Sequence, residues 1–269
     1  MGDRHVWGMI DARPVVFPAQ VDEASMALMH WDVPVPGAAT LVPEDAFELV
    51  PTHEGLARVT LLLADYRRGD WGPSAYASLT VPVRPADHDR PAGLRLCHGV
   101  TNAAFTDEVM YWALGVSGAL GDLSLAYRND EVTVRVATDG EDGLLARLPR
   151  PPSPEGGRPI EVDVYTCAGE AARRVRYELD APAIPVAPDE VVLEAGTGPL
   201  ADAFRDVGLL RPPLGCTWGE RLRMTINRPV ALDDDAEAGT EAGTDTSGGP
   251  DAPADAPGPA PERAGRGPR

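Results

Sequence analysis

Alternating apolar and polar residues predict β-strands along most of this 269-residue chain. Residues 57–66 are rich in Leu and β-branched side chains, are too short for a typical helix, and end at a turn containing Gly and Pro. Residues 76–83 alternate, with Tyr76, Ser78 and Thr80 on one face and small and aliphatic residues on the other. Further strands are predicted at residues 94–100, 123–127, 131–136, 160–167, 175–179 and 216–226. Residues 123–127 and 131–136 form a predicted hairpin, in which Leu123, Leu125 and Tyr127 alternate against Val132, Val134 and Val136 across residues 128–130.

Residues 197–208 carry the clearest helical pattern in the chain. Thr197 is the predicted N-cap, Pro199 lies in the first turn, and Gly208 ends the helix after an apolar stripe. Residues 26–32 fit either a strand, which would carry Trp31 inward, or a short helix. Many strands, short turns and no repeated strand–helix–strand unit predict a mainly β (α+β) fold. The architecture we expect is an antiparallel β-barrel or closed sandwich with a few helices.

Composition divides the chain into two parts. After Leu232 there is no Leu, Ile, Val or aromatic residue, so the segment 233–269 cannot bury enough apolar surface to offset the entropy of ordering. We therefore expect one β-barrel domain over residues 1–232 and a disordered acidic tail, rich in Ala, Gly and Pro, over residues 233–269. The net charge of −18 disfavours nucleic acid and anionic membranes as partners.

Cysteine and histidine spacing gives no sign of a disulfide frame or a metal site. The cysteines Cys97, Cys167 and Cys216 are far apart and form no CxxC pair, which fits buried thiols in a reducing cytoplasm. The five histidines form no HxH or HExxH motif, so no metal is predicted. The Gly-rich segments match neither phosphate-loop nor dinucleotide patterns, so we expect no cofactor. With no signal or membrane-spanning pattern, the predicted location is cytoplasmic.

Four blocks of sequence resemble the acetoacetate decarboxylase family. They are the segment 105–123 with Gly115, Leu120 and Asp122, the string YRRGDWGP at residues 66–73, the segment 41–51, and the C-terminal helix and strand. The second block is similar to actinobacterial members of the family. The resemblance covers about residues 12–230 and implies a cone-like barrel with an internal pocket, and a homo-oligomer.

Two catalytic positions of that family are changed in this chain. Gly118 stands where the resemblance places the Schiff-base lysine, and the chain contains no lysine at all, since its 24 basic residues are all Arg. Arginine cannot replace it because its guanidinium stays protonated. Apart from the Met1 amine, which nothing places in the pocket, Schiff-base chemistry is thus excluded. Tyr76 occupies the place of the family's pocket carboxylate.

The remaining candidate site residues are drawn from the segments around these two positions. Met110, Tyr111 and Trp112 add apolar bulk and either line a cavity or pack as ordinary core. Trp31 and Trp218 are further candidates for substrate contact. His98 precedes the segment 105–123 and either faces the pocket or is structural.

Glu220 lies between Trp218 and Leu222 on its strand, on the face that alternation also assigns to Cys216, Met224 and Ile226. It is either a general acid whose pKa burial raises, or a structural carboxylate bonded to Arg or to backbone.

These features favour a lysine-free enzyme of specialised, polyketide-type metabolism. It would bind an extended, apolar, polyketide-like small molecule in the barrel and promote a cyclisation, rearrangement (including pericyclic ones), dehydration or isomerisation, largely by orienting its substrate. The alternative is a non-catalytic protein that binds a small apolar metabolite. A third hypothesis is decarboxylation without an imine, with Arg68 or Arg95 holding the carboxylate.

Overall fold

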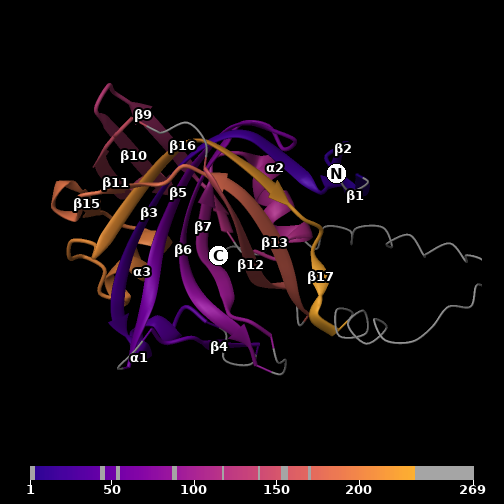
Figure 1. The fold of residues 1–269 in the computed structure, drawn as a ribbon, viewed down its shortest axis with the longest axis horizontal. Helices are drawn as coiled ribbons and strands as arrows, with labels where there is room; N and C mark the ends of the chain where they lie inside the picture. Colours follow the sequence, from indigo (N-terminus) through magenta and orange to yellow (C-terminus); the bar gives the residue numbers. More distant parts are fainter. Residues whose placement is uncertain are drawn as a thin grey trace, which may run out of the picture.

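An eleven-stranded sheet forms the body of the protein (Figure 1). The structure, a computed structural model, describes residues 4–42, 46–52, 55–86, 90–116, 118–138, 140–152, 157–168 and 171–233. The predicted tail therefore lies, except for Asp233, outside the described residues. The strands of the sheet are β3 (Ala19–Pro34), β4 (Phe47–Leu49), β5 (Leu56–Gly69), β6 (Ser74–Pro85), β7 (Gly93–Thr101), β8 (Gly118–Leu120), β12 (Arg158–Ala168), β13 (Ala171–Ala181), β14 (Ile184–Val186), β16 (Gly215–Ile226) and β17 (Val230–Ala231).

The hydrogen-bonded path through this sheet closes on itself, because β13 pairs with β16. Its order is β14-β16-β3-β5-β6-β7-β12-β13-β17, and β13 also pairs with β16 through Leu179 and Met224. We call the seven strands β16, β3, β5, β6, β7, β12 and β13 the strand ring. Most pairs are antiparallel, as predicted, but β7 pairs in parallel with β12 and with β8, so the sheet is mixed. Parallel neighbours need a long crossover, and the chain between β7 and β12 contains three of the four strands of a second sheet.

That second sheet has four strands in the order β15-β11-β10-β9. They are β15 (Val192–Ala195), β11 (Glu141–Pro149), β10 (Glu131–Thr138) and β9 (Asp122–Tyr127). The predicted hairpin is confirmed in its register, with Val134 opposite Leu125. An N-terminal hairpin, β1 (His5–Ile10) with β2 (Arg13–Phe17), stands apart from both sheets, and Figure 1 shows it beside α2 (Ala104–Glu108). The other helical elements are α1 (Val35–Ala39), the π-helix η1 (Val109–Ala113), the short 3-10 helix η2 (Pro188–Glu190) and α3 (Pro199–Asp206).

Strand alternation divides the apolar residues between two cores. On β6, the predicted faces are confirmed: Ala77, Leu79 and Val81 are buried in the core that also contains Leu123 of β9 and Phe204 of α3. Tyr76 of the opposite face belongs to a second core inside the strand ring. This period-two division is what leaves room for a cavity inside the ring.

The last long strand, β16, contributes to both cores because it contains a β-bulge. The sequence predicted Trp218 and Met224 on one face of a regular strand, and that assignment is wrong. The register with β3 shifts between Gly219 and Leu222, and Arg221 has a φ of 57°. One extra residue reverses the side-chain parity of all residues beyond it. Trp218 therefore packs in the core shared with the second sheet, whereas Met224 lies inside the ring.

Two local predictions for helical segments can also be decided. Residues 26–32 form part of β3, so the strand alternative is confirmed. The predicted C-terminal helix exists, with Pro199 in its first turn, but Thr197 is not its N-cap. Gly198 occupies that position with a φ of 98°, which glycine adopts more easily than threonine. No helix among the described residues is both long enough and apolar enough to pass through a bilayer.

Candidate functional site

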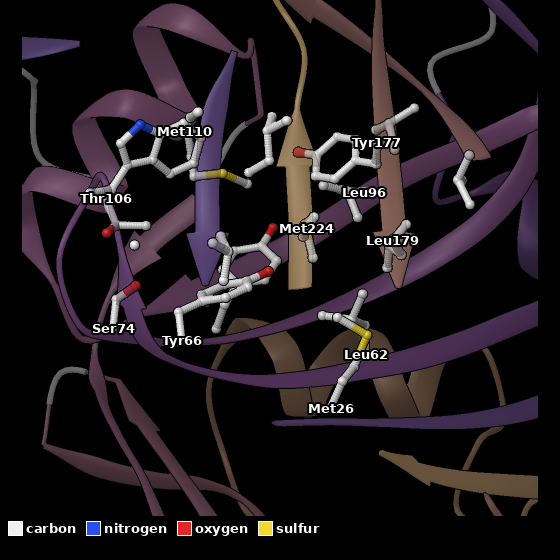
Figure 2. Close-up of a pocket in the computed structure, with 18 of the residues that line it drawn as sticks. Met26, Leu62, Tyr66, Ser74, Leu96, Thr106, Met110, Tyr177, Leu179 and Met224 are labelled. Carbon is white, nitrogen blue, oxygen red and sulfur yellow. The ribbon is translucent and has the colours of Figure 1, made fainter. Parts of the chain in front are cut away.

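A cavity of about 140 Å³ lies inside the strand ring (Figure 2). All seven ring strands contribute side chains to its wall, and α2 and η1 contribute Thr106 and Met110. Most of the wall is aliphatic, and no charged side chain of the described residues lines it. The volume is close to that of a cavity that holds benzene. The aliphatic and thioether side chains in the wall are Ala19, Val21, Met26, Leu28, Leu62, Leu94, Leu96, Met110, Val162, Val164, Leu179, Met224 and Ile226.

Three tyrosines bring phenol groups to this apolar cavity. Tyr66 on β5, Tyr76 on β6 and Tyr177 on β13 all line it. Burial raises the pKa of Tyr66 to about 12 and raises the pKa of Tyr177 well above its ordinary value. Burial likewise raises the pKa of Tyr76, while the neighbouring Ser78 hydroxyl opposes the shift. All three phenols therefore stay protonated at physiological pH and act as hydrogen-bond donors.

Three polar groups in the wall find no hydrogen-bond partner of ordinary geometry among the described residues. They are the hydroxyls of Tyr76 and Thr106 and the indole N–H of Trp71. Tyr76 and Thr106 are 4% and 2% exposed, so water outside the protein cannot satisfy them. The Ser78 hydroxyl beside Tyr76 is already directed at the carbonyl oxygens of Leu79 and Cys97, each at 2.9 Å. Buried donors of this kind are unusual and mark a site that another molecule can complete.

Gly118 lies behind the wall that Tyr76 forms. It pairs with Gly99 across β7 and β8, and a Cβ on Gly118 would stand 3.0 Å from the Gly99 carbonyl oxygen and 3.6 Å from Asp107 Oδ1. A Cβ on Gly99 would stand 2.6 Å from the Tyr76 hydroxyl. The Tyr76 ring therefore occupies the space over this glycine pair, and Gly118 itself does not line the cavity.

A second, more polar pocket of about 370 Å³ lies on the other side of β7, where Gly118 and His98 are found. His98 is exposed and has a φ of 51° at a register shift between β6 and β7. Burial of its ring lowers the pKa of His98, against the opposing charge of Asp206. The structure thus separates His98 from Tyr76, since the two residues line different pockets.

Glu220 forms an ion pair instead of facing the cavity. Its carboxylate accepts hydrogen bonds from Nε and an Nη of Arg150, at 2.5 and 3.2 Å. Burial alone would raise the pKa of Glu220, but the Arg150 hydrogen bonds and charge outweigh it and lower the pKa below 4.5. The expected raised pKa is therefore wrong, and the alternative of a structural carboxylate bonded to Arg describes its surroundings. The β16 bulge gives the reason, because Glu220 lies inside it.

The apolar candidates fall into three environments. Met110 lines the cavity. Tyr111 is 39% exposed, whereas Trp112 packs partly buried against the core that contains Met110 and donates its indole N–H to Glu108 at 2.6 Å. Trp31 and Trp218 are both fully buried in the core shared with the second sheet, where the Trp31 indole N–H donates to the Arg211 carbonyl at 2.8 Å. None of these last four lines the cavity.

Sequence reasoning missed several residues of the wall. Tyr66 lies four residues after Leu62, and this even spacing would have placed both on one strand face. Trp71 lies within the string at residues 66–73 that resembles the family, but that resemblance gives no sign that its side chain lines a cavity. Tyr177 lies in a predicted strand with weak alternation, and Thr106 has no sequence signal as a cavity residue. Among the described residues, no three His, Cys, Asp or Glu side chains lie close enough together to hold a metal ion.

Comparison with known proteins identifies the fold. No protein-family model and no curated protein sequence matches this chain. Acetoacetate decarboxylase from Legionella pneumophila subsp. pneumophila str. Philadelphia 1 superposes with a TM-score of 0.62 at 12% identity, covering 80% of this chain and 87% of that one. The enduracididine biosynthesis enzyme MppR complexed with pyruvate gives 0.57 at 12% identity, covering 81% and 90%.

An acetoacetate decarboxylase-like enzyme from Sphingomonas wittichii RW1 gives a TM-score of 0.53 at 15% identity, covering 80% and 91%. The chain therefore has the acetoacetate decarboxylase-like fold, as the resemblance predicted.

Proposed function

We propose that the protein is an enzyme of the acetoacetate decarboxylase-like type that acts on a neutral, mainly apolar small molecule without forming a Schiff base. One observation carries the proposal: the cavity inside the strand ring has no charged side chain in its described wall, but has three protonated tyrosines. A chain without lysine cannot form the imine from a side chain. A carboxylate substrate would also find no cation in this wall, and burying it unpaired would be strongly unfavourable.

The wall supports reactions that need orientation and hydrogen bonding more than proton abstraction. None of the tyrosine phenols has a pKa near neutrality, so none is suited to act as a general base there. A cyclisation or rearrangement of a neutral substrate needs no such base and can gain from being held in a reactive conformation. The cavity accepts about one six-membered ring, so an extended polyketide-like substrate would place only its reacting segment inside.

The same lack of a titratable group near neutrality favours a second candidate function. A protein that binds a small apolar metabolite without turning it over needs only the apolar wall and the tyrosine donors. Decarboxylation held by Arg68 or Arg95 has less support, because neither arginine lines the cavity.

The selectivity for neutral ligands can be tested with fluorobenzene and 4-fluorobenzoate. We expect fluorobenzene to bind wild-type protein in ¹⁹F NMR titrations and to lose binding when Met224→Trp fills the cavity, and 4-fluorobenzoate not to bind. Tighter binding of the benzoate would contradict the proposal. Incubation with a panel of neutral polyenes and enones then distinguishes an enzyme from a binding protein. Products are detected by mass spectrometry and by separation of isomers. Ligands that bind but are recovered unchanged favour the non-catalytic function.

A further inference from the structure

Four of the hydrogen-bonding side chains that line the cavity lie close together along the chain fold, at one end of it. The pairing of β5 with β6 sets Tyr66 opposite Ser74, and Trp71 lies in the turn that joins these strands. Tyr76 pairs with Thr101 at the end of β7, and the chain then enters α2 with Thr106. We call Trp71, Ser74, Tyr76 and Thr106 the polar end. In the view of Figure 2, Ser74 and Thr106 lie on the left of the cavity.

The opposite end is formed mainly by hydrocarbon side chains, with Tyr177 of β13 above them in Figure 2. Leu62 and Leu179 lie on the right of the cavity in Figure 2, with Met26 below them. All three line the cavity and carry no group able to donate a hydrogen bond. A ligand with one polar atom would therefore be oriented by this wall, with the polar atom at the polar end and the rest of the ligand against hydrocarbon.

The polar end has the chemistry of a hydrogen-bond donor set. An indole N–H can donate but cannot accept, so whatever meets Trp71 Nε1 must be an acceptor. The Tyr76 phenol keeps its proton because burial raises its pKa, and the Thr106 hydroxyl can turn its hydrogen toward the same acceptor. A carbonyl oxygen has two lone pairs and no charge to desolvate, so it suits two such donors inside an apolar wall.

We propose that the cavity binds a neutral carbonyl compound of about the size of a six-membered ring, with its oxygen at the polar end and its carbon skeleton against Leu62 and Leu179. This inference rests on the proposed function, because it specifies the ligand class and orientation for that same cavity. Tyr76 is the residue that determines specificity for the carbonyl group. Its hydroxyl, buried and without a partner of ordinary geometry among the described residues, gains one when the ligand enters.

A matched pair of ligands isolates the carbonyl oxygen. Cyclohexanone and methylenecyclohexane have nearly the same shape, but only the ketone has a strong acceptor. We expect the ratio of cyclohexanone affinity to methylenecyclohexane affinity, measured by calorimetry or NMR titration, to be at least about fivefold higher in wild type than in Tyr76→Phe. The ketone gives up its hydrogen bonds to water on entry, and only wild type returns one from Tyr76. The affinity of Tyr76→Phe for methylenecyclohexane should stay within about twofold of wild type.

Tyr165→Phe is the matched control, because Tyr165 is equally buried and donates to the Pro91 carbonyl at 2.9 Å outside the cavity. It should keep the wild-type ratio, and Thr106→Val, which keeps the side-chain shape, should reduce it.

The possible results separate this inference from the function on which it rests. If Tyr76→Phe leaves the ketone-to-alkene affinity ratio of wild type unchanged, the inference is overturned while the apolar cavity function stands. If neither ligand binds and fluorobenzene also fails to bind, both are overturned. An affinity ratio that falls in Tyr76→Phe and stays at the wild-type value in Tyr165→Phe supports the assignment.

Discussion

Replacing Glu220 by Gln tests whether this residue is structural. The change removes the charge that Arg150 pairs with and keeps the side-chain volume almost constant. In the wild-type protein the Glu220 carboxylate accepts two hydrogen bonds from the guanidinium, one from Nε and one from an Nη. Gln offers only one acceptor oxygen and no charge, so one bond and the Coulombic attraction are lost.

The structure sets the size of the expected loss. The Glu220 side chain is 13% exposed and that of Arg150 is 29% exposed, so the pair is screened less than a surface pair but is not fully buried. Hydrogen bonds to charged groups contribute about 1.5–3 kcal/mol, and partial solvation places this pair at the lower end. We expect the Gln variant to lose about 1–2 kcal/mol of unfolding free energy at pH 7. For a domain of this size that is a fall of roughly 2–8 °C in Tm.

The loss should depend on pH with a defined sign. The folded-state pKa of Glu220 lies below its ordinary value of 4.5, because the Arg150 interactions outweigh desolvation. Its contribution to stability is therefore fully present above pH 4.5 and disappears as the pH falls through the folded-state pKa. The difference between wild type and the Gln variant should be constant from pH 8 to 6 and should close below pH 4.5.

Urea unfolding of both proteins at a series of pH values measures this difference directly. Glu194→Gln is the matched control, because its pair with Arg147 is 59% and 44% exposed and contributes less than about 0.5 kcal/mol. A Gln variant as stable as wild type at pH 7, or one whose deficit grows on acidification, would refute the structural assignment. Loss of turnover without loss of stability would instead restore Glu220 as a catalytic candidate.

Two further predictions concern Gly118 and the thiols. Gly118→Lys should not restore imine chemistry: its Cβ would meet the Gly99 carbonyl at 3.0 Å, costing about 1–3 kcal/mol, and Asp107 would hold the amine protonated. Borohydride with acetoacetate should therefore leave no adduct by mass spectrometry, and a trapped adduct would contradict this geometry. Cys97 is buried, and burial raises its pKa to about 11. Iodoacetamide at pH 8 should therefore label the partly exposed Cys167 first, and equal labelling rates would show that Cys97 is accessible.

Strand positions were predictable because burial on one face imposes a period of two. The segment 57–66 lies within β5, and the faces of residues 76–83 on β6 are as predicted. The hairpin register of Val134 with Leu125 also followed from alternation and a short turn. These features depend on local sequence, so a single sequence is enough to predict them.

The site was less predictable because it depends on irregularities that alternation does not encode. A one-residue bulge at Arg221 separates Glu220 and Trp218 from the cavity residue Met224. The π-helix η1 turns Met110 inward and leaves Tyr111 exposed. Thr106 reaches the wall only through the packing of α2 against the end of β7, a tertiary contact without a sequence motif.

The place of β16 in the strand ring has a consequence for how the protein is made. This strand pairs with β3 on one side and with β13 on the other, so it is the element that completes the ring. During synthesis, β3 leaves the ribosome long before its partner exists and keeps an open edge throughout. The second sheet, built mainly from neighbours in sequence, can form early, whereas ring closure waits for contacts between distant segments. The ligand cavity is therefore assembled last, after residue 226 has emerged.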